Sequence, residues 1–111
     1  MVTPLTRRSF SSGKLKASLA DQTSQALAVA TATKARFIDL NKASAAYVSA
    51  LGATDAGEYN LEADDTTHLN AAGTKVFGRM VSHLLVAKYA DIKAYTIADA
   101  ATSAKITAGT L

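Results

Sequence analysis

The sequence predicts an α/β domain organised around a parallel sheet. Helix-like and strand-like segments alternate along the first half of the chain with tight joints between them, and one long polar loop interrupts the otherwise regular pattern. The composition favours helix over strand, because 24 of the 111 residues are Ala and there is a single Pro. A chain of this length forms one domain at most, with a thin core.

The first expected elements are the end of a strand and a helix. Residues 2–5 have strand character, and Pro4 prevents further pairing just before a polar stretch begins. From about Lys14 to Lys34 apolar residues recur at helical spacing, and Ser11 or Ser12 is a candidate N-cap for this helix. The recurring apolar residues are Leu15, Leu19, Ala26, Leu27 and Ala30.

A second strand and a second helix are expected next. Residues 35–40 are mostly apolar and include β-formers, which predicts a short buried strand. Asn41 is a natural N-cap for a helix that runs through Leu51, and Gly52 is suited to a left-handed stop. Because helix, strand and helix follow one another so closely, the strands are expected to be parallel.

The third region combines a polar loop with the strongest predicted helix. Residues 53–70 show no periodicity, and loops of this length in compact domains tend to be functional. Asn70 is expected to cap a helix over about Ala71–Lys88, whereas residues 91–111 form a helical or irregular tail. The apolar stripe of this helix consists of Val76, Phe77, Met80, Val81, Leu84 and Leu85.

Charge and composition exclude several classes of partner. The first sixteen residues carry four basic and no acidic residues, whereas the rest of the chain is close to neutral. The basic character is therefore a local patch rather than a stripe that follows a phosphate backbone, and we expect no nucleic-acid partner. No apolar run approaches the roughly 18 residues of a membrane span, so no membrane partner is expected. Without Cys, disulfides and thiolate chemistry are excluded.

The polar loop holds the one group of residues with a clear chemical interpretation. A general base requires an imidazole whose remote nitrogen is held by a carboxylate, which fixes the tautomer and stabilises the imidazolium. Asp65 and His68 are three residues apart, so a tight turn would bring them together, and Asp64 is an alternative partner. The competing interpretation is a structural loop capped by the same carboxylate.

Other chemical candidates are weaker. Arg7 and Arg8 could clamp an anionic substrate, although such a pair is more often solvated. His83 falls in the middle of a predicted helix, where packing or partial exposure is expected. A zinc site built from Asp65, His68 and a distant acid would lack a His-x-x-x-His pair, so neither a metal nor a cofactor is expected. Gly-Asp-Ser and Gly-x-Ser-x-Gly nucleophile motifs are both absent.

The order of these segments resembles an SGNH (GDSL-type) hydrolase, and within that superfamily the rhamnogalacturonan acetylesterase-like carbohydrate esterases. The resemblance rests on residues 3–8 (TPLTRR), a helix containing Ala20-Asp21, residues 37–41 (FIDLN), and residues 65–70 (DTTHLN) followed by Gly73. It covers about residues 2–90. Residues 1–90 are accordingly expected to be the carboxyl-terminal half of an SGNH hydrolase domain, followed by the tail.

The resemblance implies a partial three-layer α/β/α sandwich of the flavodoxin-like kind, truncated to its last strands and helices. It also implies a secreted serine esterase that deacetylates a pectic polysaccharide without a metal or cofactor. Carried over by position, His68 would be the general base and Asp65 its orienting carboxylate. The family's blocks with the nucleophilic Ser and the oxyanion hole have no counterpart here. The chain alone is therefore expected to be inactive.

Two alternatives remain open at this point. The chain could be a catalytically inactive fragment or an interaction module. It could also be a small helical mitochondrial protein that matches by chance, because residues 1–20 are basic, rich in Ser and free of acids, as in a transit peptide. If residues 3–8 form the loop after an inner strand, the similarity to a transit peptide is a coincidence.

Overall fold

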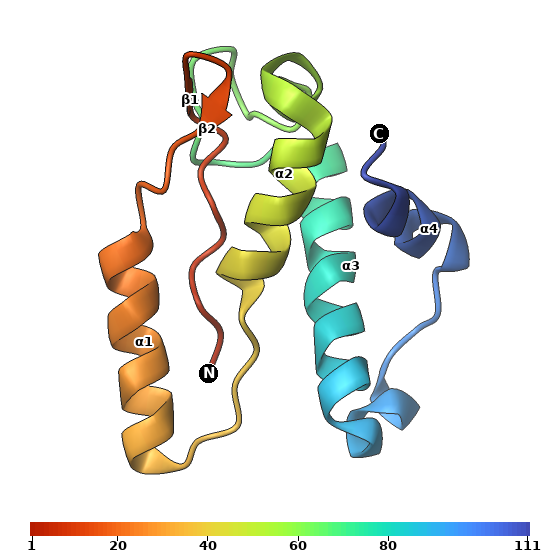
Figure 1. The fold of residues 1–111 in the computed structure, drawn as a ribbon. Helices are drawn as coiled ribbons and strands as arrows, with labels where there is room; N and C mark the ends of the chain where they lie inside the picture. Colours follow the sequence, from red (N-terminus) through yellow and green to blue (C-terminus); the bar gives the residue numbers. More distant parts are fainter.

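Helices make up 59% of the chain in a computed structural model that describes residues 1–111. Two long helices pack against each other, and the first long helix is drawn on the other side of the N-terminal segment, which pairs with the connection between the first two helices (Figure 1). The elements in order are β1 (Phe10–Ser11), β2 (Lys14–Leu15), α1 (Ala20–Thr33), α2 (Leu40–Gly57), α3 (Ala71–Lys88), the 3-10 helix η1 (Ala90–Tyr95) and α4 (Ala100–Ala108). The protein is thus a mixed α/β domain, mostly helical, with one two-stranded sheet.

The two strands form a hairpin where the sequence predicted the start of a helix. β1 and β2 pair antiparallel, with Phe10 opposite Leu15. Ser12 and Gly13 connect them with positive φ angles of 48° and 74°. Two successive residues with positive φ suit the twist of a tight hairpin. Gly13 adopts such an angle without steric cost, whereas for Ser12 it is an uncommon conformation. The side chains of Phe10 and Leu15 pack against the core, which explains why apolar residues occur here.

The first helix therefore begins later than predicted. It starts at Ala20 rather than near Lys14, and its N-cap residue Leu19 makes no capping side-chain hydrogen bond. The prediction that Ser11 or Ser12 would cap it was wrong, because both serines belong to the hairpin. Ala30 is the one buried residue of α1.

The predicted strand over residues 35–40 is reduced to a single parallel bridge between Val2 and Ile38. The Thr3 amide donates to the Ile38 carbonyl (3.2 Å), and the Ile38 amide donates to the Met1 carbonyl (3.1 Å). Ile38 is 2% exposed, as expected for a buried strand, whereas Leu40 already belongs to α2. This bridge is the only parallel pairing in the chain.

The start of α2 shows that the predicted cap was wrong by two residues. Asp39, not Asn41, is the N-cap, and its carboxylate accepts from the Lys42 amide (3.1 Å) and the Thr3 hydroxyl (2.9 Å). The Asn41 side chain instead donates to the Pro4 carbonyl (3.1 Å). These contacts fasten the N-terminal segment to the first turn of α2.

Gly52 interrupts α2 without ending it. Its φ of 79° lies in the region that favours glycine, but its ψ of 177° is not left-handed helical, so the predicted left-handed stop was wrong. The chain then resumes a helical path as far as Gly57, so the predicted loop over residues 53–70 begins about five residues later than expected. The shorter loop is easier to hold in one conformation.

The core lies mainly between α2 and α3. It is built around three aromatic rings, those of Tyr47, Tyr59 and Phe77, whose centroids are 5.6–6.3 Å apart. The bounds predicted for α3 are confirmed, and Asn70 caps it by accepting from the Gly73 amide (2.9 Å). The buried members of the core cluster are Leu40, Tyr47, Val48, Ala56, Tyr59, Phe77 and Met80.

The tail, which the sequence left open as helical or irregular, is helical. It returns along α3 through η1 and α4, and Arg79 donates to the Ser103 hydroxyl (2.8 Å) across this contact. The hydroxyl of Tyr47 donates to the Thr110 carbonyl (2.8 Å), which joins the end of the chain to α2. None of the helices combines the length and the apolar character that crossing a membrane would require.

Candidate functional site

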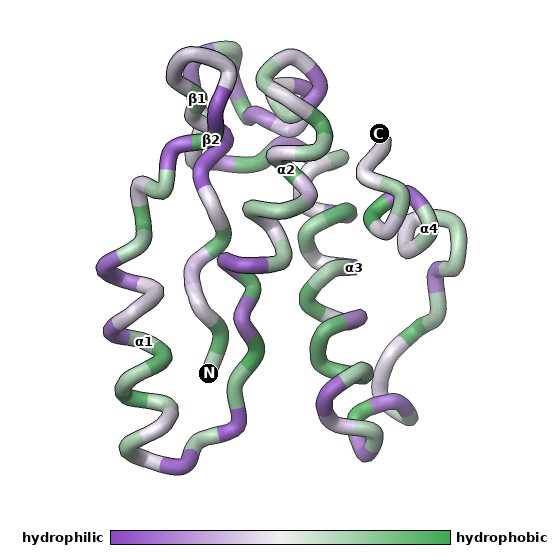
Figure 2. The backbone as a smooth tube through the Cα atoms, viewed as in Figure 1, coloured by the Kyte–Doolittle hydropathy of each residue, from purple (hydrophilic) through white to green (hydrophobic).

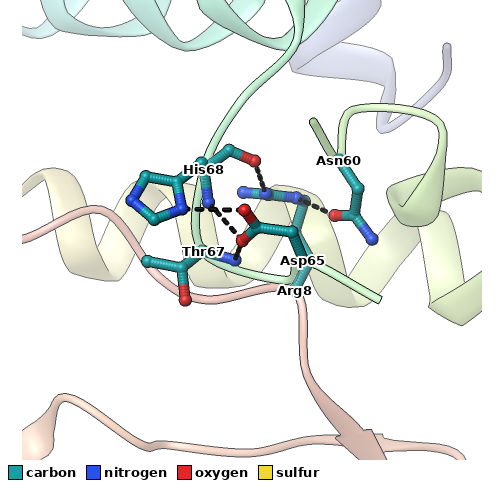
Figure 3. Close-up of polar contacts among 5 residues, drawn as sticks. All are labelled: Arg8, Asn60, Asp65, Thr67 and His68. Carbon is teal, nitrogen blue, oxygen red and sulfur yellow. Dashed lines mark hydrogen bonds and ion pairs between the residues drawn. The ribbon is translucent and has the colours of Figure 1, made fainter. Parts of the chain in front are cut away.

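Asp65 and His68 are in direct contact in the loop between α2 and α3 (Figure 3). One carboxylate oxygen of Asp65 lies 2.8 Å from Nδ1 of the imidazole. The other oxygen accepts from the main-chain amides of Thr67 (2.9 Å) and His68 (2.8 Å). Asp64, the alternative partner, is exposed and makes no such contact. A single tight turn therefore places the carboxylate and the ring together.

The hydrogen bonds around Asp65 determine its charge state. The amides of His68 and Thr67, together with the imidazole, lower the pKa of Asp65 to about 2, so the carboxylate is ionised at neutral pH. An ionised carboxylate can only accept, so Nδ1 of His68 must donate. In the neutral imidazole, Nε2 then keeps its lone pair. The His68 side chain is 73% exposed, which leaves this nitrogen open to an incoming group.

Main-chain pairing closes the loop that carries the two residues. Asn60 and Leu69 form an antiparallel bridge at its base, and the Leu61 amide donates to the His68 carbonyl (3.1 Å). Asn70, directly after the bridge, caps α3 and also donates through its side-chain amide to the main chain at the end of α2 (2.7 Å). The loop is therefore held at both ends by rigid helices.

Gly73 allows the first turn of α3 to lie close to Tyr59 and Leu69 at the base of the loop. A Cβ atom at this position would lie 2.9 Å from Cδ2 of Leu69 and 2.9 Å from the carbonyl oxygen of Tyr59. Both distances are well inside van der Waals contact. The first turn of α3 can thus pack on the loop only with glycine at this position.

Arg8 also contacts the loop, and its role differs from the prediction. It was a candidate clamp for an anionic substrate together with Arg7, but it is 3% exposed, whereas Arg7 is exposed. The Arg8 Nε donates to the Asn60 side-chain oxygen (2.6 Å), and Nη2 donates to the His68 carbonyl (2.7 Å). The pattern of residues around Arg8 did not reveal this role, because its hydrogen-bond partners Asn60 and His68 lie 52 and 60 residues away in the sequence.

The cavities of the molecule lie away from this pair. The largest, of about 490 Å³, lies between α3 and α4, and none of the four cavities is lined by Asp65 or His68. His83 is exposed on α3, at the edge of two of the cavities. No three acidic or histidine side chains gather in a way that could hold a metal ion. The candidate pair therefore lies on an open surface.

The fold and the site together define a mixed α/β domain that presents an exposed, carboxylate-held imidazole. No protein-family model, curated protein or solved structure matches the chain. Arguments about its activity therefore rest on the residues and the geometry described above.

Proposed function

We propose that Asp65 and His68 are the carboxylate and imidazole of an SGNH-type ester hydrolase site that deacetylates a pectic polysaccharide such as rhamnogalacturonan. One observation supports this proposal above the others. An ionised Asp65 holds Nδ1 of a largely exposed ring, which leaves Nε2 as a free base directed at solvent.

In the proposed reaction His68 Nε2 takes the proton of a serine hydroxyl, and the resulting alkoxide attacks the acetyl carbonyl. Asp65 stabilises the imidazolium that forms. The tetrahedral intermediate then collapses: the bond from the acetyl carbon to the sugar oxygen breaks, and His68 protonates that oxygen so that it leaves as a hydroxyl and an acetyl-serine remains. Water attacks this ester with His68 again as the base, and acetate and the free serine are released. No step requires a metal or an organic cofactor.

The serine and the oxyanion donors are the parts that the site here does not supply. The ring of His68 makes a single hydrogen bond, which goes to Asp65, and no hydroxyl of the chain reaches it. In our proposal the chain provides the base and its carboxylate, and the serine comes from polypeptide outside these 111 residues. The isolated chain is accordingly proposed to be inactive, and the active form to be secreted.

The proposal includes a three-layer α/β/α fold in the active form. Two observations support it: the pairing between Val2 and Ile38 is parallel, and neither residue pairs with a further strand. A strand with one paired and one open side can accept a further strand. An added segment that carries the serine would extend the bridge into a parallel sheet, with α1 and α2 joined to it by short connections.

A complementation assay tests the proposal. The 111-residue chain is assayed on an aryl acetate and on acetylated pectin, alone and together with an amino-terminal segment of an SGNH carbohydrate esterase that carries the Gly-Asp-Ser block. We expect no turnover by the chain alone and measurable deacetylation by the mixture. In the mixture, His68→Ala should reduce kcat by several orders of magnitude and Asp65→Asn by about 10²- to 10⁴-fold.

Two neighbouring substitutions serve as matched controls. Asp64→Asn removes an adjacent carboxylate that does not contact the ring, and His83→Ala removes the other histidine; both should leave turnover unchanged. If the chain alone showed turnover and His68→Ala abolished it, the proposal that the serine comes from polypeptide outside these 111 residues would be contradicted. A mixture that stays inactive, or in which Asp65→Asn behaves like Asp64→Asn, would contradict the hydrolase proposal itself.

A further inference from the structure

We propose that Arg8 is the positioning residue of the Asp65–His68 pair: its guanidinium holds the main chain at His68 so that Nδ1 of the ring stays on Asp65. This role deepens the proposed function and rests on it, because a fixed ring orientation matters for catalysis only if the ring acts as a base. The Arg8 side chain makes no hydrogen bond to the imidazole; its partners are the Asn60 side chain and the His68 carbonyl (Figure 3).

Three hydrogen bonds connect Arg8 to both sides of the loop. Its main-chain amide donates to the Thr66 carbonyl (2.9 Å), and Nη2 donates to the His68 carbonyl (2.7 Å). Nε donates to the side chain of Asn60, which pairs with Leu69 at the base of the loop (2.6 Å). The planar guanidinium can bridge two acceptors in a fixed geometry, which the single ammonium of a lysine cannot reproduce.

The His68 carbonyl is the point at which this network acts on the ring. It accepts from the Leu61 amide as well as from Arg8, so two donors fix the peptide plane that follows His68. The amide on the other side of His68 is held by Asp65. With both flanking peptide groups fixed, the side chain leaves the main chain in one direction, toward the carboxylate of Asp65.

The burial of Arg8 shows that this arrangement is costly. The side chain is almost fully enclosed, its acceptors are uncharged, and Nη1 is buried without a partner. Burial lowers the pKa of Arg8, and the nearby charge of Asp65 partly offsets this effect. A buried, incompletely paired cation is less favourable than an apolar residue of similar size. Its presence directly behind the candidate pair therefore points to a role beyond packing.

The proposal can be tested on the ring itself by NMR. In the ¹⁵N-labelled 111-residue chain at neutral pH, we expect His68 to carry its proton on Nδ1, and His83, whose ring makes no hydrogen bond, to show the common Nε2–H form. Arg8→Met should move the ring proton of His68 from Nδ1 to Nε2, as in His83. It should also speed hydrogen exchange of the His68 main-chain amide by roughly tenfold or more. Arg8→Lys, which retains the charge, should restore the pattern only in part.

Arg7→Met is the matched control, because it removes the neighbouring arginine, which is exposed. It should leave both histidines unchanged. Retention of the Nδ1 proton in a folded Arg8→Met variant would overturn the proposal. If that variant does not fold, the proposal is tested instead by hydrogen exchange of the Arg8 Nε–H group in the wild-type chain. We expect the Arg8 proton to exchange as slowly as the His68 amide, and exchange as fast as that of Arg7 would overturn the proposal.

These readouts separate the two proposals. None of them depends on turnover, so an inactive complementation mixture would contradict the hydrolase function and leave the positioning role of Arg8 intact. The loss of the Nδ1 proton in Asp65→Asn, with Arg8 still protected from exchange, would confirm that the ring is held by the carboxylate and the main chain by the arginine. A wild-type His68 without a proton on Nδ1 would overturn both.

Discussion

The helices α1 and α3 were predicted from the same signal, apolar residues at helical spacing, yet the structure anchors them very differently. α3 is capped by Asn70 and buries Phe77 and Met80 in the core. α1 has no side-chain cap, and Ala30 is its one buried residue. Figure 2 shows hydrophobic residues along the lower half of α1. Val29, four residues before the end of this helix, is nevertheless 49% exposed. Periodicity indicates a helix, whereas side-chain volume decides whether the helix is anchored.

The difference follows from what each helix can bury. Apolar burial stabilises by roughly 25 cal/mol per Å², so a methyl group contributes far less than an aromatic ring. The residues of α1 that are at least partly buried are Thr23, Ala26, Leu27 and Ala30, and Ala30 is the one that is fully buried, while α3 buries a ring and a long thioether. We therefore expect the free energy of unfolding to depend strongly on α3 and weakly on the side chains of α1.

The largest expected effect comes from truncating the core side of α3. Phe77→Ala removes a ring that contacts both Tyr47 and Tyr59 and should lower the free energy of unfolding by about 3–5 kcal/mol. Val29→Ala on α1 truncates a half-exposed side chain and should change it by less than about 0.5 kcal/mol. Urea denaturation of the two variants measures both values. Equal losses would show that α1 is anchored as firmly as α3.

A smaller effect is expected from two glycines within α3 itself. Gly73→Ala would place a Cβ atom against Leu69 and Tyr59 and should destabilise the protein by about 1–3 kcal/mol. Gly78→Ala has open space and should stabilise the same helix by about 0.5–1 kcal/mol. Thermal melts of both variants measure these changes. The same sign for both substitutions would mean that α3 does not pack on the candidate loop as described.

The smallest expected effect is an acid transition confined to the loop before α3. The folded state lowers the pKa of Asp65 to about 2, so its contribution is complete above the unfolded pKa, near 4, and is lost as the pH falls toward 2. The amide resonances of Thr67 and His68 should shift over this range, while those of α1 beyond its first turn, which holds Asp21, change little. Asp65→Asn should abolish the shift. If the acid-induced shift of the amide resonances were unchanged in Asp65→Asn, a group other than Asp65 would cause it.

The sequence allowed prediction of the features that depend on near neighbours. Asn70 caps α3 through an amide three residues ahead, and Asp65 contacts a ring three residues ahead. In both cases short separation in the chain forces proximity once a turn forms. The hairpin was missed although Ser12-Gly13 is a turn signal, because the apolar spacing of Leu15 and Leu19 suggested that the helix was already under way. Competing local signals were resolved by packing against the core.

Taken alone, the sequence determined that a carboxylate and an imidazole would meet at the start of a well-capped helix. Tertiary structure decided how that turn is held: Arg8 rather than Arg7 is buried behind it, and Asp39 rather than Asn41 begins α2 with help from Thr3. These choices depend on contacts between residues 36 to 60 positions apart. Such contacts arise from the burial and pairing of distant segments, which the spacing of residues along one segment does not encode.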